Sequence, residues 1–182
     1  SAKNKIINEL NLVMEFHSML PVVQNPAYTE KYEGFNHLTN LKGEVEVAVS
    51  KDIIRNHDME KFTSQKEQFK TIQTYMNEKY GYQAVQLNIK DSYYNMFEVI
   101  KNHMYIVELA EKAISHVGLT PFREAIRGGT DGARLTYEGL LCPNLGTGGY
   151  QFHGRMEFAS INQMRKATEV FIEIVKLSVN PV

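Results

Sequence analysis

Apolar residues recur at helical spacing in four long stretches of the chain. Side chains three or four positions apart share one face of a helix, so each stretch predicts an amphipathic helix that packs on a core. The predicted helices span residues 3–18, 58–79, 102–116 and 160–179. In the first of them, the residues expected to face inward are Ile6, Ile7, Leu10, and Val13 or Met14.

Apolar and polar residues alternate in three other segments, with the period of a strand that has one solvent-facing side. These segments are residues 35–41, 43–54 and 85–89. Gly43, together with Asn40 and Lys42, predicts a hairpin turn between the first two strands. Two further short segments, 122–126 and 143–145, are also expected to be strands. The first half therefore has the order α-β-β-α-β, which predicts a sheet with both helices on one face.

Residues suited to starting and ending helices lie at the predicted helix boundaries. Asp58 is expected to cap the second helix and Gly81 to end it. Asn102 is expected to cap the third helix. Ser160 and Gln163 have the spacing of a capping box ahead of the last helix. The residues of that helix expected to face a core are Ile161, Met164, Phe171, Val175 and Ser178.

The stretch from Ile126 to Gly154 holds most of the chain's twelve glycines. Glycine is needed where the backbone takes a positive φ or comes close to other atoms. A loop is expected at 127–130, followed by a short helix that Thr130 or Asp131 caps and Gly139 ends. These features alone leave two interpretations open. The main chain is either shaped around a ligand or forms a glycine-rich crossover without chemistry.

The composition is that of a globular protein without a polyanionic partner. Hydrophobic residues make up 43% and charged residues 23% of the chain, the formal net charge is −1, and the pI is about 6.6. No apolar run approaches the roughly 20 residues that span a bilayer, and the start does not resemble a secretory signal. We therefore expect no nucleic-acid or membrane partner and a cytoplasmic location. The single cysteine, Cys142, cannot form an internal disulfide, and its apolar neighbours favour a packed side chain over a nucleophile.

Six histidines are present, but their spacing alone does not predict a metal site. No two are arranged as His-x-x-x-His, and one cysteine cannot give a Cys-x-x-Cys pair. His17 and His116 lie near predicted helix C-termini, where an imidazolium suits the helix dipole. His37, in a strand, and His57, ahead of a helix cap, have no second ligand at a suitable spacing. His103 is expected to be exposed.

Several short motifs occur together in one order. The second half contains RGGTDGA at 127–133, CPN at 142–144, TGG at 147–149 and a Tyr-x-x-His-Gly motif at 150–154. The first half contains YEGF at 32–35, IIR at 53–55, Asp58, and DSYYNM at 91–96. This set resembles peptidase T, the tripeptide aminopeptidase of the two-zinc aminoacylase and carboxypeptidase clan. The family places a strand and a His-Pro-Gly turn ahead of the first helix, so the resemblance implies the C-terminal portion of such an enzyme.

The resemblance implies an α/β fold in two parts. Residues 1–91 would form a partial ferredoxin-like lid, the α-β-β-α-β portion of a βαββαβ unit whose first strand is missing. Residues 92–182 would form the C-terminal part of the zinc-peptidase catalytic domain. Only some branches of the family dimerise through the lid edge, so the resemblance leaves the oligomeric state open, with a homodimer of that kind as one alternative.

The resemblance also assigns a metal ligand. His153 matches the terminal ligand histidine of a site that holds two zinc ions. The other ligands and the general-base glutamate belong to the N-terminal half of the family. One imidazole cannot hold two zinc ions, so the isolated chain is expected to contain no catalytic residue and to have no peptidase activity.

Arg55 and Arg127 match positions where the family presents an arginine to the active site, from the lid and the catalytic domain respectively. A guanidinium pairs with a carboxylate through a fork of donors. The resemblance therefore implies that both bind the C-terminal end of a tripeptide as the lid closes over it. The alternative for each is a surface salt bridge, with Asp58 for Arg55 and Asp131 for Arg127.

Three functions remain open on the sequence. The first is part of a zinc enzyme that releases the N-terminal residue of tripeptides by metal-activated water. The second is a non-catalytic interaction piece whose lid edge pairs with another copy or with the missing half. The third keeps the same clan but changes the substrate to a dipeptide or an N-acyl amino acid.

Overall fold

The computed structural model of the chain describes residues 7–179. It contains both helices and strands, and its contacts divide it into two compact units. The first unit comprises Ser1–Ser92 and Ala125–Arg127, and the second comprises Tyr93–Glu124 and Gly128–Val182. The segment Ala125–Arg127 thus groups with residues that precede it in sequence by more than thirty positions.

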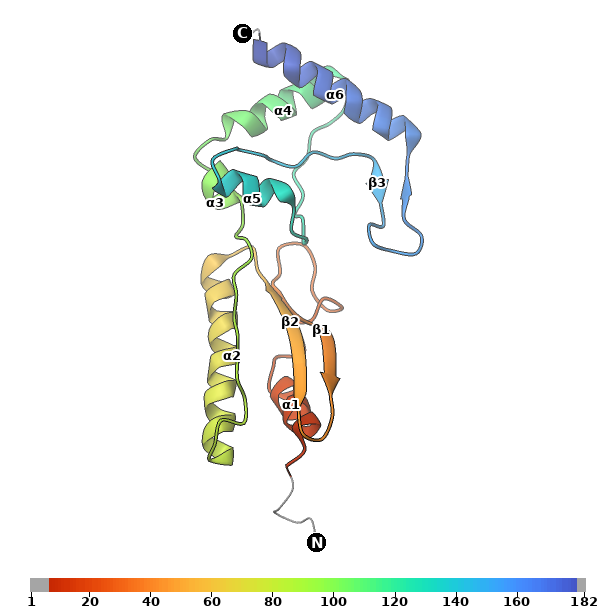
Figure 1. Cartoon of the computed structure of the whole chain (residues 1–182). Coiled ribbons are helices and arrows are strands. Elements are labelled where there is room, and N and C mark those ends of the chain that lie inside the picture. Colours follow the sequence, from red (N-terminus) through yellow and green to blue (C-terminus); the bar gives the residue numbers. More distant parts are fainter. Residues whose placement is uncertain (1–6, 180–182) are drawn as a thin grey trace. The chain divides into compact units, whose positions relative to one another are not determined.

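The first unit contains an antiparallel hairpin and two helices (Figure 1). Its elements are α1 (Glu9–Ser18), β1 (Phe35–Gly43), β2 (Ala48–Arg55) and α2 (Met59–Tyr80). The hairpin register pairs Phe35 with Arg55 and Gly43 with Ala48, with an irregularity between Leu38 and Asn40. The predicted turn position was wrong by a few residues, because the chain reverses at 44–47, where the Glu44 N–H donates to the Val47 carbonyl at 2.7 Å.

Both helices of the first unit contribute to one apolar core. Leu12 and Phe16 of α1 pack with residues of α2, and Ile54 of β2 lies against the same cluster. The α2 members of that cluster are Phe69, Ile72 and Met76. The predicted inward face of the first helix omitted the buried Leu12 and Phe16; of the two alternatives offered, Val13 is half-buried and Met14 is 65% exposed. The predicted start of that helix at residues 3–6 lies outside the described residues, and α1 begins at Glu9.

Helix α2 has the boundaries that its end residues predict. The Asp58 side chain accepts a hydrogen bond from the Lys61 N–H at 2.9 Å, which satisfies one of the unpaired donors of the first turn. Gly81 follows the last turn with φ +74°, a conformation that glycine adopts without a steric penalty. Both predictions are confirmed.

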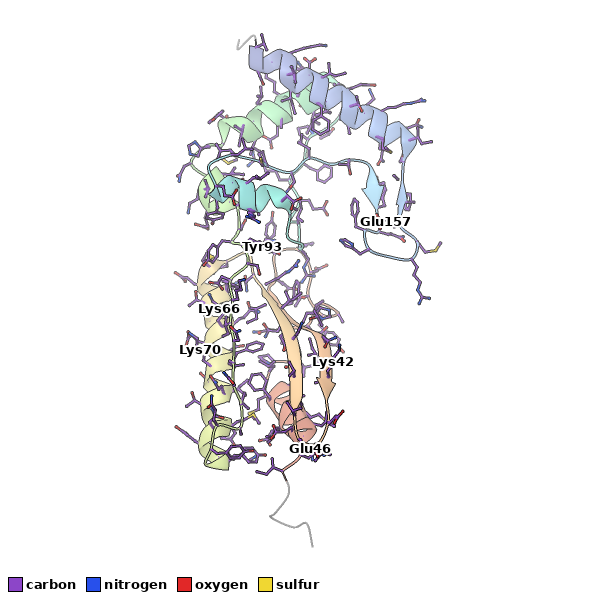
Figure 2. All side chains as sticks on the ribbon, viewed as in Figure 1. Lys42, Glu46, Lys66, Lys70, Tyr93 and Glu157 are labelled. Atoms are coloured by element: carbon purple, nitrogen blue, oxygen red, sulfur yellow. The ribbon has the colours of Figure 1, made fainter. Side chains whose placement is uncertain are left out.

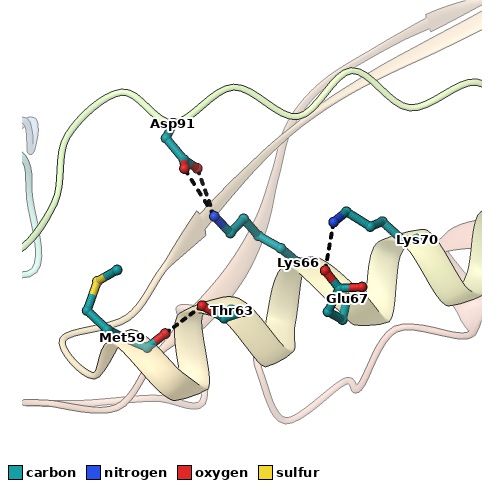
Figure 3. Close-up of polar contacts among 6 residues, drawn as sticks. All are labelled: Met59, Thr63, Lys66, Glu67, Lys70 and Asp91. Carbon is teal, nitrogen blue, oxygen red and sulfur yellow. Dashed lines mark hydrogen bonds and ion pairs between the residues drawn. The ribbon is translucent and has the colours of Figure 1, made fainter.

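The segment after α2 does not form the predicted strand at 85–89. Asn77 and Gln73 hold the backbone of Val85, and Val85 and Leu87 pack against the core while Gln86 and Asn88 are exposed. At the far end, Lys66 of α2 donates to both carboxylate oxygens of Asp91 at 3.1 Å (Figure 3). The alternation is present, but no strand of the described part of the chain lies alongside to form a ladder.

The second unit is mainly helical. Its elements are α3 (Phe97–Ile100), α4 (Tyr105–His116), α5 (Asp131–Tyr137), β3 (Gly149–Tyr150), β4 (Phe158–Ala159) and α6 (Ile161–Val179). Strands β3 and β4 form a short antiparallel pair, and α4 packs on α6. The strands predicted at 122–126 and 143–145 are absent from the described structure. As at 85–89, no described strand pairs with them.

Two helix starts in the second unit differ from prediction. Asn102 does not cap α4, which begins at Tyr105, because the cap position is Met104, whose side chain makes no cap hydrogen bond. Ahead of α6, the Ser160 hydroxyl accepts from the Gln163 N–H at 3.4 Å, but the Gln163 side chain bonds to Tyr150 instead of returning to Ser160. Only half of the predicted capping box therefore forms.

Helix α6 carries apolar residues on more than one face. Val170 is buried, whereas the residues predicted to face a core are exposed: Ile161 69%, Met164 49%, Phe171 49% and Val175 63%. The apolar residues of α6 cover a wide arc of the helix, so periodicity alone could not show which part of that arc is buried. Among the described residues no helix is long and apolar enough to cross a membrane.

Candidate functional site

Arg127 is held by the loop that precedes β1. Its Nη1 donates to the Thr29 carbonyl, and its Nη2 donates to the Thr29 hydroxyl at 2.6 Å and the Glu33 carbonyl at 3.3 Å. The guanidinium carbon also lies 4.9 Å from the centre of the Phe35 ring, a cation–π distance. These contacts fix the plane of the guanidinium. They replace the predicted alternative, a salt bridge to Asp131, because the Arg127 donors are directed to the 29–33 loop.

Three of the five N–H donors of Arg127 are used in this way. The Nε donor is buried without a partner in the described structure, and one N–H on Nη1 remains. A bidentate fork needs two parallel donors on one edge, and both N–H groups of Nη2 are occupied. In this arrangement Arg127 can therefore offer a carboxylate one hydrogen bond and its charge, but no fork.

Arg55 and His57 contact the same short segment through its backbone. Arg55 lies at the end of β2, and its Nη1 donates to the Arg127 carbonyl at 2.7 Å. The His57 Nε2 lies 3.1 Å from the Ile126 carbonyl. The first unit thus brings the Arg55 side chain to the Arg127 main chain, although 72 positions separate them in sequence. Asp58, the alternative partner of Arg55, caps α2.

A shallow hollow of about 310 Å³ lies on the same loop of the first unit. It is lined by Glu30, Lys31, Tyr32, Glu33, Gly34 and Lys61. The lining includes the YEGF motif that the sequence singles out, and it carries charges of both signs. Such a surface can hold the polar backbone and termini of a short peptide better than a purely apolar group.

The glycine-rich stretch packs closely against other parts of the second unit. A Cβ on Gly129 would lie 2.4 Å from the ring of Tyr93, and one on Gly132 would lie 2.6 Å from the Cys142 carbonyl. The RGGTDGA motif is therefore in contact with both the DSYYNM motif and the CPN motif (Tyr93 is labelled in Figure 2). Asn144 strengthens the second contact by donating to the Thr130 hydroxyl at 3.3 Å.

The glycines of the TGG motif also pack closely against other residues of the second unit. A Cβ on Gly148 would lie 2.7 Å from that of Gln163, and one on Gly149 would lie 2.6 Å from the Phe152 ring. Packing within the chain thus accounts for Gly129, Gly132, Gly148 and Gly149. These four glycines do not require the interpretation in which the main chain is shaped around a ligand. The short helix α5 begins after Thr130 as predicted, although the structure shows no side-chain cap there.

His153 lies in a tight loop between β3 and β4. Both Gln151 and His153 have positive φ, +54° and +65°, which is uncommon for residues other than glycine. The Gly154 N–H donates to the Gln151 carbonyl at 2.8 Å, and the His153 N–H donates to the Glu157 carboxylate at 3.0 Å. Figure 2 shows Glu157 on this loop. His153 is exposed, so its imidazole is available to a ligand.

An open hollow of about 390 Å³ adjoins this loop in the second unit. Its lining is mostly apolar and consists of Thr147, Gly149, Phe152, Glu157, Phe158, Ala159 and Met164. Tyr150 stacks on Phe158 with ring centres 5.0 Å apart, which stiffens the short β3–β4 pair.

The residues of this structure do not by themselves fit a two-zinc site. No group of three or more His, Cys, Asp or Glu side chains within residues 7–179 is placed to hold a metal ion. A structural or catalytic zinc needs at least three protein ligands. His153 therefore stands as a single candidate ligand.

Two other histidines lie beside carboxylates. His17 Nδ1 lies 3.7 Å from Asp52, and His116 Nδ1 lies 3.0 Å from Glu173. His103 is exposed beside Tyr105, as predicted. Cys142 is half-buried, and its backbone N–H donates to the Thr136 hydroxyl at 3.0 Å.

Two carboxyl groups of the first unit have shifted pKa values. Burial raises the pKa of Asp52 above its ordinary value, although the nearby His17 acts in the opposite direction. Hydrogen bonds from Lys79 and Tyr80 lower the pKa of Glu15. Neither group contacts the arginines or His153 in the described structure, so both shifts concern stability rather than a site.

Curated peptidases T are similar to this chain along nearly its whole length. The protein from Clostridium perfringens is 50% identical over 177 residues, which is 97% of this chain and 44% of the relative. The protein from Alkaliphilus oremlandii is 47% identical over 177 residues, 97% of this chain and 43% of the relative. The chain is a homologue of part of peptidase T. No protein-family model matches it.

Two solved structures have a similar fold in the part that matches this chain. A tripeptidase from Staphylococcus aureus aligns with a TM-score of 0.66 at 19% identity, over 94% of this chain and 45% of its own. The aminopeptidase PepT from Bacillus cereus aligns with a TM-score of 0.62 at 16% identity, over 98% of this chain and 48% of its own. The chain spans about 44% of the length of the curated peptidases T that it matches.

Some residues around the candidate site could not be identified from the sequence. Thr29 and Glu33 hold Arg127 through backbone oxygens and one hydroxyl, and no local pattern marks such contacts. Glu157 is an ordinary surface carboxylate by sequence, yet it fixes the backbone of His153. Gln65 carries a usable signal, because it is a polar residue at the helical spacing of the buried Phe69, Ile72 and Met76.

Proposed function

We propose that the protein to which this chain belongs is a zinc-dependent aminopeptidase that removes the N-terminal residue of tripeptides. The observation that supports this most strongly is 50% identity to a curated peptidase T over 97% of the chain. The names of the two structural neighbours, a tripeptidase and an aminopeptidase, agree with it. Dipeptides and N-acyl amino acids are the competing substrates.

In this proposal Arg55 and Arg127 bind the C-terminal carboxylate of the peptide. Their positions in one compact unit, joined by the 2.7 Å hydrogen bond from Arg55 Nη1 to the Arg127 carbonyl, support a common task. Arg127 contributes one charge-assisted hydrogen bond and its positive charge, since the 29–33 loop occupies its other exposed donors.

His153 is proposed as one ligand of a metal pair. Its exposure and its fixed backbone support this role, because a ligand must be both reachable and held in place. The described residues provide no complete metal site, so the remaining ligands must come from elsewhere in the intact protein. The isolated chain is therefore proposed to be inactive.

The two units are proposed to be parts of different domains. The α-β-β-α-segment order of the first unit supports a lid of βαββαβ type without its first strand, over residues 1–91. The second unit, residues 92–182 in the prediction, would belong to the catalytic domain. Residues 125–127 pack with the first unit, although the predicted boundary assigns them to the second.

The test is a substrate panel on the full-length protein. Free tripeptides should be hydrolysed at least 100 times faster than dipeptides or N-acetylated amino acids, and a chelator should abolish the activity until zinc is restored. The same tripeptides with a blocked N-terminus serve as the control. Preferential hydrolysis of dipeptides or N-acyl amino acids would reject the tripeptide assignment while keeping the clan.

A second candidate function, pairing through an open strand edge, is supported by the segment after α2. The sheet of the first unit has two strands, so β2 has no neighbour on the side away from β1 within the described residues. The backbone groups of residues 86–90 form no hydrogen bond to other described residues. An added strand would satisfy both edges, which is the usual way that exposed edges recruit a partner.

Mixing experiments separate these candidates. The chain combined with the separately produced N-terminal half of a peptidase T should recover zinc-dependent tripeptide hydrolysis if it is an enzyme fragment. A chain that forms stable dimers by light scattering, and that recovers no activity on mixing, would instead support an interaction piece.

A further inference from the structure

Four side-chain amides form a continuous hydrogen-bonded chain in the first unit. Asn56 donates to Gln65 at 2.9 Å, Gln65 donates to Asn36 at 3.1 Å, and Asn36 donates to Gln24 at 3.0 Å. The backbone repeats the last link, because the Asn36 N–H donates to the Gln24 carbonyl at 2.6 Å. Each amide passes one donor to the next residue, so the chain has a single direction.

Gln65 is the centre of this chain and is only 3% exposed. It lies on the face of α2 that also carries Phe69, Ile72 and Met76. A buried amide contributes little to net stability, and it is tolerated only when its groups are paired. Gln65 accepts from Asn56 and donates to Asn36, so it connects two segments that an apolar residue could not join.

The amide chain encloses the loop that holds Arg127. Gln24 and Asn36 bracket residues 25–35, and the loop residues Thr29 and Glu33 accept the hydrogen bonds of Arg127. Asn36 directly follows Phe35, whose ring lies under the Arg127 guanidinium. A loop fixed at both ends keeps these acceptors, and hence the guanidinium, in one place.

The other end of the amide chain lies beside Arg55. Asn56 follows Arg55 in sequence, and its Oδ1 accepts from the Asp58 N–H at 3.0 Å at the start of α2. Its amide nitrogen is packed on the backbone of Gly34, where a Cβ would lie 2.0 Å away. The amide chain thus touches the neighbours of both arginines.

We propose that Gln65 is a positioning residue that fixes Arg55 and Arg127 relative to each other, and thereby sets the affinity for the substrate's C-terminal carboxylate. The inference rests on the proposed function of the two arginines. Gln65 itself contacts no substrate in this proposal. It acts through Asn36 on the Arg127 loop and through Asn56 on the end of β2.

The test uses the full-length enzyme and the variant Q65M, which keeps the length and apolar stem of the side chain but removes the amide. With Ala-Ala-Ala as substrate, KM should rise about tenfold while kcat changes less than threefold. With Ala-Ala-Ala amide, which lacks the carboxylate, the variant and the wild type should have equal KM values. A merely structural role for Gln65 would change both substrates in parallel, and that result would overturn the proposal.

Q73M is the matched control. Gln73 lies on the same helix and donates to the Val85 carbonyl, away from the arginine loop, and Asn77 still donates to that carbonyl after the change. Q73M should leave the KM ratio of the two peptides unchanged. A KM ratio shifted as far by Q73M as by Q65M would also reject the proposal.

A milder variant protects the test against misfolding. Gln24 lies at the half-buried end of the amide chain, and Q24M removes only the side-chain oxygen that accepts from Asn36, while the backbone hydrogen bond between the two residues remains. Q24M should raise KM for the free peptide severalfold and leave the peptide amide unaffected; no change for either peptide would count against the proposal. If the wild-type enzyme hydrolyses no tripeptide, the proposed function fails. If it does and the variants do not shift the ratio, only the role of Gln65 fails.

Discussion

The two candidate regions of this chain differ in how their functional side chains are held. In the first unit the Arg127 guanidinium has three hydrogen bonds and an aromatic ring beneath it, and a buried amide chain supports the loop that binds it. In the second unit only the backbone of His153 is held, through Glu157, and its imidazole has no hydrogen bond to another described residue.

This difference corresponds to the chemistry proposed for each residue. A guanidinium that binds a carboxylate needs its plane fixed in advance, because an unfixed side chain loses conformational entropy on binding. A metal-ligand imidazole takes its final orientation from the metal and from the other ligands. The arginine region is therefore complete within its unit, whereas the histidine loop offers one part of a larger arrangement.

The largest expected effect comes from replacing His153 in the full-length protein. H153A should lower zinc affinity by at least roughly 100-fold, because even residues that only support a ligand cost 10–100-fold. Zinc content after dialysis, measured by atomic emission, checks this. H103A, at another exposed histidine, should retain full zinc content. Normal zinc binding in H153A would remove this residue from the metal site.

Replacing Arg127 tests the other region. R127A should reduce kcat/KM for a free tripeptide roughly 30-fold, since a charge-assisted hydrogen bond is worth about 2 kcal/mol. R134A serves as the control, because Arg134 forms only an exposed pair with Glu138 in the described structure. Unaltered tripeptide kinetics in R127A would show that this arginine acts only on the 29–33 loop.

A stability prediction concerns the packing around the second region. Thr136 is 1% exposed, and its hydroxyl accepts from the Cys142 N–H at 3.0 Å. T136V keeps the volume but leaves that N–H unsatisfied, which should cost about 1–2 kcal/mol of unfolding free energy. Urea unfolding of the purified chain measures this. T136S, which keeps the hydroxyl, should cost less; equal losses in both variants would show that the methyl group matters more.

The smallest expected effect is a pH-dependent one in the first unit. Because burial raises the pKa of Asp52 above 3.8, the native state favours the protonated form, and the stability linked to it is lost as pH rises through the native pKa. D52N should therefore stabilise the chain at pH 7 by no more than about 1 kcal/mol. The gain should shrink as pH falls toward 4. A loss of stability in D52N at pH 7 would show that the pairing with His17 outweighs the burial.

Local signals predicted the fold best where an element depends only on its own residues. Helix α2 begins after Asp58 and ends before Gly81, as those two residues indicate. The strand predicted at 85–89 has the correct alternation but forms no ladder. A strand needs hydrogen bonds from a neighbour, and sequence alternation cannot show whether that neighbour belongs to the same chain.

The residues of the candidate site were likewise predictable only in part from the sequence. Arg55, Arg127 and His153 could be named from motifs, and their roles remain proposals. The partners of Arg127, Thr29 and Glu33, lie almost one hundred positions away in sequence, so only the folded chain shows them. Gln65 could have been noticed as a polar residue at a buried helical position, but its effect on the arginine loop depends on Asn36 and Asn56.

Gly34 lies against the side chain of Asn56, so a substitution at this position would disturb the buried amide chain. Gly81 has open space around it and is restricted only by its φ of +74°, so a mirror-image alanine introduced there by chemical synthesis would fit the backbone. Gly34 is restricted by its neighbour instead, since any ordinary methyl group would push the Asn56 amide away from Gln65. A single carbon added at position 34 would thus break the amide chain between the end of β2, where Arg55 lies, and the loop that holds Arg127. Helix α2 itself would be unchanged.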